Sequence, residues 1–293
     1  FNANSDIYRK LRNTMRYLLG ALDGFSESER VAYADMPGLE RWVLHRLAEL
    51  DTVVREAYMA YDFKVAFHAL VNFCVVDLSA VYFDIRKDSL YCDAPSALRR
   101  RACRTVMDEV FRRLCIWFAP VMVFTCEEAW EQRFPGTASI HLQQFPETPK
   151  SWLDAQLADK WGRIFTIRKG VTEALEIERR EKRIGSSLEA AVRVYVPDGR
   201  LRASLDGEDP AELFITSSAE VVGADMPSTG YQKAGIEGVG VETVRAPGIK
   251  CARSWKYFDP ADPTNPADPD FPDITPRDAA AVREYRGLPP RQP

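Results

Sequence analysis

The first 135 residues place apolar side chains at the spacing of α-helices. In residues 5–22, the apolar positions recur every three or four residues and form one stripe, made of Ile7, Leu11, Met15, Leu18 and Leu22. Similar patterns run through residues 39–58 and 62–82, and the second of these is apolar on most sides, as a central helix is. Proline and glycine delimit two more helical segments, at 95–120 and 121–133. Five helices with short connections predict an antiparallel bundle.

The pattern changes beyond residue 150. Residues 152–184 keep the helical period, and we expect Gly185 to end this helix. From residue 186 on, β-branched residues cluster between Gly, Pro and Asp, which predicts short strands. Prolines at every third position from 260 to 272 favour an extended polyproline II arm without a core. Thr275-Pro276-Arg277-Asp278 then has the form of a capping box that opens a short helix.

We therefore predict a mainly α protein in four parts. These are a helical bundle at residues 1–150, a long connecting helix at 151–185, a small α+β unit at 186–258, and a proline-rich arm with a short terminal helix at 259–293.

Composition narrows the class of protein. With 293 residues and a formal net charge of −4, the chain has no overall basic field, so a nucleic-acid surface has to be a local patch. The six cysteines form no C-x-x-C pair and most lie in apolar helical segments, which indicates reduced core thiols and a cytoplasmic protein. No apolar run approaches the roughly 20 residues that span a bilayer, so we expect no membrane partner.

Motifs for catalysis are missing from the sequence. It contains no P-loop, no dinucleotide-binding motif, no H-E-x-x-H and no serine nucleophile elbow. Two of the three histidines, His45 and His68, lie inside helical patterns, where a core or boundary role is the simpler interpretation. We therefore predict no catalytic residue in this chain.

The stretch K-C-A-R-S-W-K-Y (250–257) resembles a zinc knuckle that lacks a ligand. Ser254 stands where a second thiolate is needed after Cys251, and no Cys or His follows in the sequence. A structural zinc site needs four such ligands, so we expect neither zinc nor another cofactor here. Lys250, Arg253 and Trp255 interleave cations with an aromatic ring, as a surface that stacks unpaired bases requires. The alternative interpretation is a strand edge with Trp255 buried.

A second candidate surface lies on the first helix. Arg9, Arg12, Asn13 and Arg16 are three, four and seven residues apart and share the face opposite the apolar stripe. This basic face suits phosphate and base contacts, although Asn13 is equally explained as a cap or a bridge between helices. Arginines 99–101 and 104 and the charged run 176–183 extend the cationic candidates, but a solvated face with internal ion pairs is the simpler interpretation of both.

Several stretches, in order along nearly the whole chain, resemble the C-terminal part of a bacterial isoleucyl-tRNA synthetase, a class I aminoacyl-tRNA synthetase. S-D-I-Y-R-K-L-R-N-T-M-R-Y-L-L (5–19) is similar to the opening helix of that family's anticodon-binding domain, and W-F-A-P-V-M-V-F-T-C-E-E-A-W (117–130) to a later block. I-G-S-S-L-E-A (184–190) and K-C-A-R-S-W follow in the expected order. The family's C-terminal zinc unit carries a Cys where this chain has Ser254, which leaves zinc in doubt.

The resemblance implies a role in tRNA recognition. The bundle type is that of class I anticodon-binding domains, and the expected partner is the anticodon stem-loop of isoleucine tRNA, contacted by the seven candidate residues named above on the first helix and at 250–255. ATP, Mg²⁺ and catalysis belong to catalytic and editing domains that we expect upstream in the same chain, so this fragment should be an inactive, monomeric piece of the ligase. Two alternatives stay open: the equivalent part of a valyl-type synthetase, and a helical protein-interaction module without RNA affinity.

Overall fold

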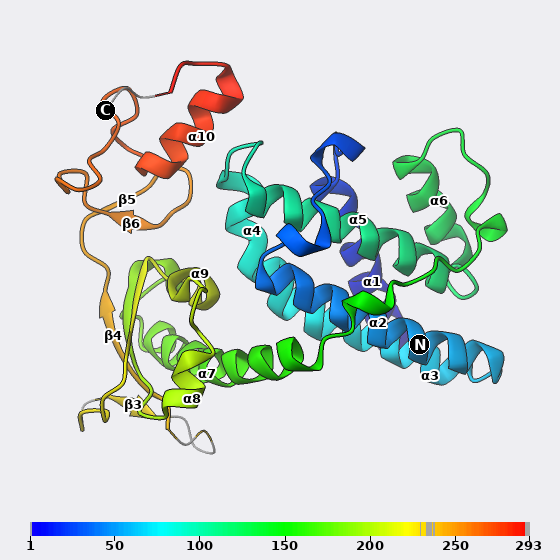
Figure 1. The fold of residues 1–293 in the computed structure, drawn as a ribbon, viewed down its shortest axis with the longest axis horizontal. Helices are drawn as coiled ribbons and strands as arrows, with labels where there is room; N and C mark the ends of the chain where they lie inside the picture. Colours follow the sequence, from blue (N-terminus) through cyan, green and yellow to red (C-terminus); the bar gives the residue numbers. More distant parts are fainter. Residues whose placement is uncertain (1, 229, 233–235, 237, 291–293) are drawn as a thin grey trace. The chain divides into compact units, whose positions relative to one another are not determined.

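A computed structural model describes residues 2–228, 230–232, 236 and 238–290 of the protein (Figure 1). Helices predominate in it and the strands are few and short, so the prediction of a mainly α fold is confirmed. The chain divides into two compact units. The first comprises residues 1–90 and 96–155, and the second comprises residues 91–95 and 156–293.

The first unit is a bundle of helices with a shared apolar core. Its helices are α1 (Asn2–Ala21), α2 (Gly38–Met59), α3 (Phe63–Asn72), η3 (Phe73–Tyr82), α4 (Phe83–Cys92), α5 (Leu98–Phe118) and α6 (Val123–Arg133). Single 3-10 turns join them: η1 (Glu27–Glu29), η2 (Tyr33–Asp35), η4 (Ile140–Leu142) and η5 (Lys150–Trp152). The predicted stripe of α1 is buried, since Leu11, Met15, Leu18 and Leu22 are each at most 2% exposed.

One uninterrupted helical path runs from Phe63 to Cys92, and its middle third, η3, is a π-helix. Within it, Ser79 Oγ donates to the carbonyl of Cys74, five residues earlier, at 2.8 Å. A π-helix is wider than an α-helix and usually lasts one turn, so ten residues of it are rare, and such segments occur frequently at functional sites. The sequence pattern did not predict this change of helix type.

The same path is the one helix in the described ranges that is long and apolar enough to cross a membrane. A central helix of a bundle in water meets that criterion too, and 39% of its most apolar window is buried inside the bundle. Asp77 within it pairs with Arg46 of α2 at 3.3 Å. One helix of this kind is weak evidence for a membrane span. The helix as a whole is more apolar than we expected, because the sequence analysis considered only uninterrupted apolar runs.

Two fully buried carboxylates, Glu40 and Asp108, form ion pairs with arginines within the bundle. Glu40 is fully buried and accepts from Nε and Nη2 of Arg86 at 2.6 and 2.7 Å. Asp108 is equally buried and accepts from Arg30, Arg112 and Arg133 at 2.7 to 3.0 Å. Burial opposes ionisation of Asp108, but the hydrogen bonds from Arg112 and Arg30 outweigh it and hold the pKa of this carboxyl below its usual range.

The second unit packs a long helix, α7 (Ala155–Arg180), against a small sheet (Figure 1). The strands are β1 (Ala190–Tyr195), β2 (Ser218–Val222), β3 (Tyr231–Gln232) and β4 (Gly240–Arg245), in the order β2-β1-β4-β3, with β1 parallel to β2 and antiparallel to β4. Short elements connect them: η6 (Ser187–Glu189), α8 (Gly199–Ala203) and α9 (Pro210–Phe214). α7 ends earlier than predicted because Lys182, with a left-handed φ of 59°, stops it in place of Gly185.

The C-terminal segment is folded, not extended. β5 (Ile249–Lys250) and β6 (Tyr257–Phe258) form a hairpin, and α10 (Pro276–Arg286) follows after a series of turns. Asp259, Asp262 and Asp268 make these turns by accepting from N–H groups two residues ahead. Ile274 packs against the buried Cys251, so the prediction of a polyproline II arm without a core is wrong.

The predicted N-cap of the terminal helix is confirmed, but the N–H of Thr275, which a capping box pairs with the residue three positions on, donates instead to Cys251 Sγ at 3.4 Å. Thr275 is the N-cap of α10, its Oγ1 accepts from the N–H of Asp278 at 3.2 Å, and Pro276 occupies the first turn. Gly287, with φ of 65°, ends the helix in the left-handed conformation that glycine adopts without strain.

Candidate nucleic-acid interface

The four candidates on α1 are exposed, but they do not form one face. Arg12 and Arg16 border a hollow of 170 Å³ between α1 and α6. Asn13 borders a larger hollow of 460 Å³ between α1 and the path of η3 and α4. Arg9 donates to Asp6 at 3.3 Å, and both side chains are more than 60% exposed. The structure therefore divides the predicted basic face between two sides of the helix.

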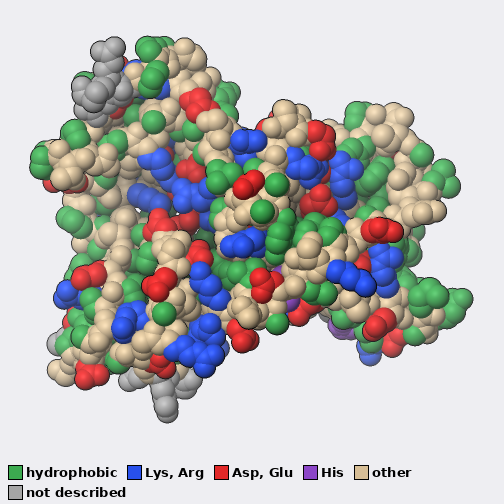
Figure 2. All heavy atoms as spheres, viewed as in Figure 1, with side chains coloured by type: hydrophobic (Ala, Val, Ile, Leu, Met, Phe, Trp, Pro, Cys, Tyr) green, Lys and Arg blue, Asp and Glu red, His purple; other side chains and the backbone are tan. Residues whose placement is uncertain are grey.

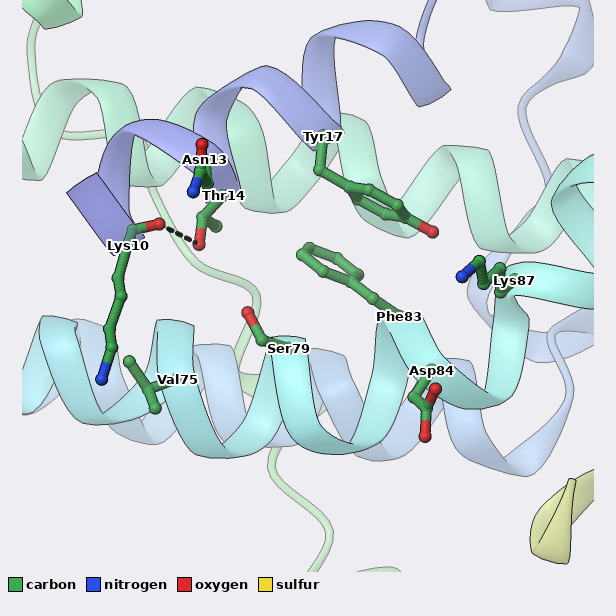
Figure 3. A pocket seen from close by; sticks show the side chains of 9 residues that line it. All are labelled: Lys10, Asn13, Thr14, Tyr17, Val75, Ser79, Phe83, Asp84 and Lys87. Atoms are coloured by element: carbon green, nitrogen blue, oxygen red, sulfur yellow. Dashed lines mark hydrogen bonds between the residues drawn. The ribbon is translucent and has the colours of Figure 1, made fainter. Parts of the chain in front are cut away.

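Figure 3 shows the larger hollow, here called the α1–η3 pocket. Its lining residues come from both sides of the gap: Lys10, Asn13, Thr14 and Tyr17 from α1, Val75 and Ser79 from η3, and Phe83, Asp84 and Lys87 from α4. The sequence analysis missed Lys10, Asp84 and Lys87, because side chains about 75 residues apart meet only once the helices pack. A helical wheel of α1 does place Lys10 beside Asn13, which is the one signal the sequence offered.

Charge on the surface is mixed. Figure 2 shows Lys and Arg side chains interspersed with Asp and Glu over the viewed face. This distribution agrees with the net charge of −4 and confines any attraction for phosphates to local patches.

The arginines of α5 have partners inside the protein. Arg104 is 4% exposed; its Nε donates to the carbonyl of Ala21 at 3.0 Å and its Nη1 to Glu29 at 2.6 Å. Arg101 donates to the carbonyls of Ser28 and Glu29. These side chains hold the segment after α1 against α5. Arg104 is therefore a buried structural residue, and it belongs neither to a solvated face nor to a surface that contacts phosphates.

The charged run at the end of α7 behaves as its simpler interpretation predicts. Arg179 pairs with Glu176 at 3.1 Å, and Arg183 pairs with Glu178 and Glu181. Both arginines are exposed, and their printed ion pairs are with glutamates of the same segment.

The candidates in the second unit lie on the β5–β6 hairpin, and we call Lys250, Arg253 and Trp255 the knuckle surface. Trp255 is 59% exposed, which rules out the alternative of a buried ring at a strand edge. Nζ of Lys250 lies 5.1 Å from the centroid of the indole ring. Arg253 is exposed, and its Nη2 donates to the carbonyl of Tyr91 at 2.8 Å. An accessible indole beside a cation is a platform for stacking a base.

The backbone of the hairpin holds Trp255 in an unusual conformation. Its φ is 65°, a left-handed value that a bulky side chain rarely takes. The N–H of Trp255 donates to the carbonyl of Cys251 at 3.1 Å, and the N–H of Cys251 donates to the carbonyl of Lys256 at 2.8 Å. Strain of this kind is found more often at functional sites than elsewhere.

A hydrogen-bond network occupies the interior of the knuckle. The buried carboxylate of Asp278 accepts on Oδ2 from Ser254 Oγ at 2.6 Å and from Cys251 Sγ at 3.0 Å. Its Oδ1 accepts from Arg277 at 2.7 Å. Cys251 Sγ in turn accepts from the N–H groups of Ser254 and Thr275, each at 3.4 Å. We call Cys251, Ser254 and Asp278 the knuckle clamp.

The side chains of the knuckle clamp do not fit the ligand set of a structural zinc ion. One thiol, one hydroxyl and one carboxylate, already hydrogen-bonded to one another, lack the four Cys or His ligands of such sites. In the described part of the chain, no group of three or more His, Cys, Asp and Glu side chains is placed to hold a metal ion.

The five cysteines outside the knuckle clamp are core residues, and Cys251 within it is buried as well. All six are buried and lie outside any disulfide, and burial raises the pKa of Cys74 and Cys115, and that of Cys126 to about 12. Thiols that stay protonated are poor nucleophiles. His45 is also structural, since its Nδ1 accepts from the N–H of Asp154 at 2.9 Å.

Comparison with known proteins identifies the family of the chain. Residues 40–195 match the family described as the anticodon-binding domain of tRNA ligase. The chain belongs to this anticodon-binding family. The match begins in α2 and ends with β1, so α1 and the knuckle surface lie outside it.

Related proteins match this chain over almost its whole length. It is 52% identical over 285 residues to the isoleucine–tRNA ligase of Agrobacterium fabrum and 53% identical over 285 residues to that of Brucella abortus; each comparison covers 97% of this chain and 29% of the relative. The isoleucine–tRNA ligase of Caulobacter vibrioides is 52% identical over 253 residues, which is 86% of this chain and 26% of the relative. The resemblance inferred from sequence motifs is confirmed, and the chain spans less than a third of these relatives.

Proposed function

We propose that the chain binds the anticodon stem-loop of isoleucine tRNA. The single observation that carries this is the knuckle surface, where Trp255, exposed and in a left-handed backbone conformation, lies beside the cation of Lys250. Membership of the anticodon-binding family and the identity to isoleucine–tRNA ligases support the choice of tRNA over the valyl-type alternative. The chain acts as a monomer in the cytoplasm, alongside further domains of the ligase.

The two candidate surfaces have different tasks in this proposal. Arg9, Arg12 and Arg16 of α1 are exposed cations that contact phosphates and fix the position of the stem-loop, while Asn13 contacts a base or sugar. Trp255 stacks on an unpaired base, which is worth about 1–3 kcal/mol per base and tolerates different sequences. Chemistry is assigned elsewhere: ATP and Mg²⁺ bind, and the amino acid is joined to tRNA, in a part of the whole protein outside this chain.

The knuckle, in the same proposal, works without zinc. The support is that Asp278 accepts from both Cys251 and Ser254, the two positions where a zinc knuckle needs thiolates, and so satisfies both side chains without a metal. Elemental analysis of the purified chain should give well under one zinc per chain, and treatment with a chelator should leave its RNA affinity unchanged. Stoichiometric zinc, or loss of binding with the chelator, would contradict a metal-free knuckle.

Fluorescence-anisotropy titration of labelled anticodon stem-loops at two salt concentrations tests RNA binding directly. The isoleucine stem-loop should bind more tightly than the valine stem-loop, and affinity should fall steeply with salt because phosphate contacts release counterions. Arg12→Ala should lower the slope of log affinity against log salt by about 1. Trp255→Ala should weaken binding by about 1–3 kcal/mol and leave the slope as it is.

Two matched variants control for loss of charge and of aromatic area. Lys64→Ala removes an exposed cation from α3, and Tyr285→Ala removes an aromatic ring that is 81% exposed on α10. Both should bind like the wild type. Salt-independent or absent binding by the folded chain, with Arg12→Ala and Trp255→Ala no different from the controls, would favour the remaining alternative, a protein-interaction module without RNA affinity.

A further inference from the structure

A third hollow, of 550 Å³, is lined by the end of α1, the turn after it and the end of α6. We call it the Arg133 hollow. Its polar and glycine positions are Arg16, Gly20, Asp23, Gly24, Gln132 and Arg133. It lies wholly within the first unit, and of these residues the contacts proposed so far use only Arg16.

Three guanidinium groups gather beside this hollow on the ring of Phe25, the residue after Gly24. Those of Arg30, Arg104 and Arg133 lie 5.5, 5.4 and 5.8 Å from the ring centroid. Each distance is within the range of a cation–π attraction. This attraction and the surrounding ion pairs hold the three cations close together.

Cations outnumber carboxylates in this region. Among the described residues, its ion pairs join six arginines to four carboxylates: Arg30, Arg100, Arg104, Arg112, Arg113 and Arg133 with Glu27, Glu29, Asp108 and Glu109. Arg16 and Asp23, which line the hollow, leave the difference unchanged. The region therefore carries a local excess of positive charge in a chain whose formal net charge is −4.

The arginines of this region repel one another. Burial lowers the pKa of Arg104, and repulsion by Arg100 and Arg133 acts in the same direction, against the attraction of Glu29. An arginine keeps its proton at neutral pH in spite of such effects, so the repulsion remains in the folded protein. An anion bound nearby reduces it.

Arg133 connects the hollow to these buried charges. Its Nη2 donates to Asp108 Oδ1 at 3.0 Å, and its side chain is 17% exposed. Its Nε is buried and has no hydrogen-bond partner among the described residues. A buried donor without an acceptor costs free energy, so an acceptor at this side chain is favourable.

A phosphate group matches the donors of the hollow. A guanidinium donates through its planar fork to two phosphate oxygens, and further oxygens remain for a second arginine and for the amide of Gln132. Gly20 and Gly24 leave room for it, because a Cβ at either position would have no described atom within 4 Å apart from the backbone around it. Asp23 repels an anion, but it is exposed and water screens its charge.

We propose that the Arg133 hollow is a phosphate-binding site. Arg16 and Arg133 donate to the phosphate oxygens, Gln132 adds a neutral donor, and the excess charge around Phe25 attracts the anion. An RNA backbone and a free polyphosphate present the same group, and the experiment separates these two sources. The site follows from the bundle alone, and only its occupation by RNA rests on the proposed function.

A charge placed in the hollow tests this proposal. Gly20→Asp adds a carboxylate there, and Gly20→Asn adds a side chain of nearly the same size without the charge. The same pair at Gly162, an exposed glycine of α7 where an added Cβ also has room, controls for the change in net charge. Far-ultraviolet circular dichroism confirms that each variant is folded.

The first arm measures binding of inorganic tripolyphosphate by isothermal titration calorimetry at low salt. Gly20→Asp should bind at least about fivefold more weakly than Gly20→Asn, which is the effect of one unit charge about 4 Å from another in water. The second arm measures binding of the isoleucine stem-loop by anisotropy. There, Gly20→Asp should lower the slope of log affinity against log salt by about 1 relative to Gly20→Asn. The two Gly162 variants should bind alike in both arms.

The outcomes identify the source of the phosphate. A difference between the Gly20 variants in the first arm alone assigns the hollow to a free phosphate-bearing ligand, a difference in the second alone assigns it to the RNA backbone, and a difference in both shows that it takes either. No difference in either arm, or equal differences at Gly20 and Gly162, would overturn the phosphate site, even where the stem-loop binds. If the wild type binds tripolyphosphate in the hollow but no stem-loop, the proposed function fails and the phosphate site stands.

Discussion

Replacement of Asp278 should loosen the knuckle by several kcal/mol. The carboxylate is fully buried and is the common acceptor for Ser254 and Cys251, at 2.6 and 3.0 Å. Hydrogen bonds to a charged group contribute about 1.5–3 kcal/mol each, and a buried donor left without a partner costs about 1–3 kcal/mol. The bond to Arg277 adds less, because that side chain is 33% exposed and water screens it. We expect Asp278→Ala to destabilise the knuckle by about 3 kcal/mol.

A double-mutant cycle isolates the bond between Asp278 and Ser254. Ser254→Ala alone removes one donor while Cys251 and Arg277 still satisfy the carboxylate, so its cost should be about 1–2 kcal/mol. The double variant has no serine hydroxyl left without an acceptor. Its loss of stability should therefore be smaller than the sum of the two single losses by about 1 kcal/mol or more. Asp273→Ala, an exposed carboxylate in the preceding turn, should change stability by less than about 0.5 kcal/mol.

Native-state hydrogen exchange read by mass spectrometry suits this measurement. The chain has two units, so a single melting curve does not report the knuckle alone. Peptides from β5–β6 and α10 give the free energy of local opening at each site. A coupling energy below about 0.5 kcal/mol, or equal effects of Asp278→Ala and Asp273→Ala, would refute the reasoning that the carboxylate holds the knuckle together.

Three further predictions concern stability elsewhere. Gly248→Ala should cost about 2 kcal/mol or more by hydrogen exchange of β5–β6, because φ is 92° and an added methyl would lie 2.2 Å from the carbonyl oxygen of Phe258. Glu40→Ala should cost about 3–5 kcal/mol in thermal or urea unfolding of the bundle, because it removes the buried carboxylate that accepts two hydrogen bonds from the buried Arg86. Because folding lowers the pKa of Asp108, its ionised carboxylate stabilises the folded protein fully above about pH 4, the pKa of an aspartate in the unfolded chain. This stabilisation is lost as the pH falls through the lower pKa of Asp108 in the folded protein. In an acid titration, Asp108→Asn should therefore be less stable than the wild type at pH 7 and lose less stability below pH 4.

Local signals in the sequence located most of the helices but not their details. The apolar stripe of α1 and the Thr275 cap were predictable because spacing and capping act within a few residues. Leu213 and Phe214 lie in the region where we predicted short strands, but they end the helix α9. Asp209 caps this helix by accepting from the N–H groups of Ala211 and Glu212, and Pro210 begins it. That signal was present in the sequence, and the β-branched residues after it obscured it.

The site was less predictable than the fold, because it depends on which side chains meet. Exposure of Arg12 followed from the helical pattern, but composition did not decide between an exposed and a buried Trp255. The place of Asp84 beside α1 depends on the packing of α4. Arg104 showed the converse: a cation in a basic run proved to be bound to carbonyls of the segment after α1. Periodicity gives the face of a helix but not the partner of that face.

The knuckle clamp and the stacking surface are mechanically connected, and this gives a test of the whole second site. Holding Trp255 in the left-handed region costs about 1–3 kcal/mol, which the surrounding contacts must outweigh. The nearest of these are the bond from Trp255 N–H to the carbonyl of Cys251 and the clamp that fixes Cys251 to Asp278. Ser254→Ala loosens the clamp but removes no charge and no exposed ring.

Ser254→Ala should therefore weaken binding of the isoleucine stem-loop severalfold while leaving its salt dependence unchanged, because every phosphate contact remains. Combined with Trp255→Ala, it should weaken binding no further, since its effect is transmitted through the ring. Additive losses in the double variant would mean that Ser254 supports RNA binding by another route, and an unchanged affinity in the single variant would mean that the strained backbone holds Trp255 in place without the clamp.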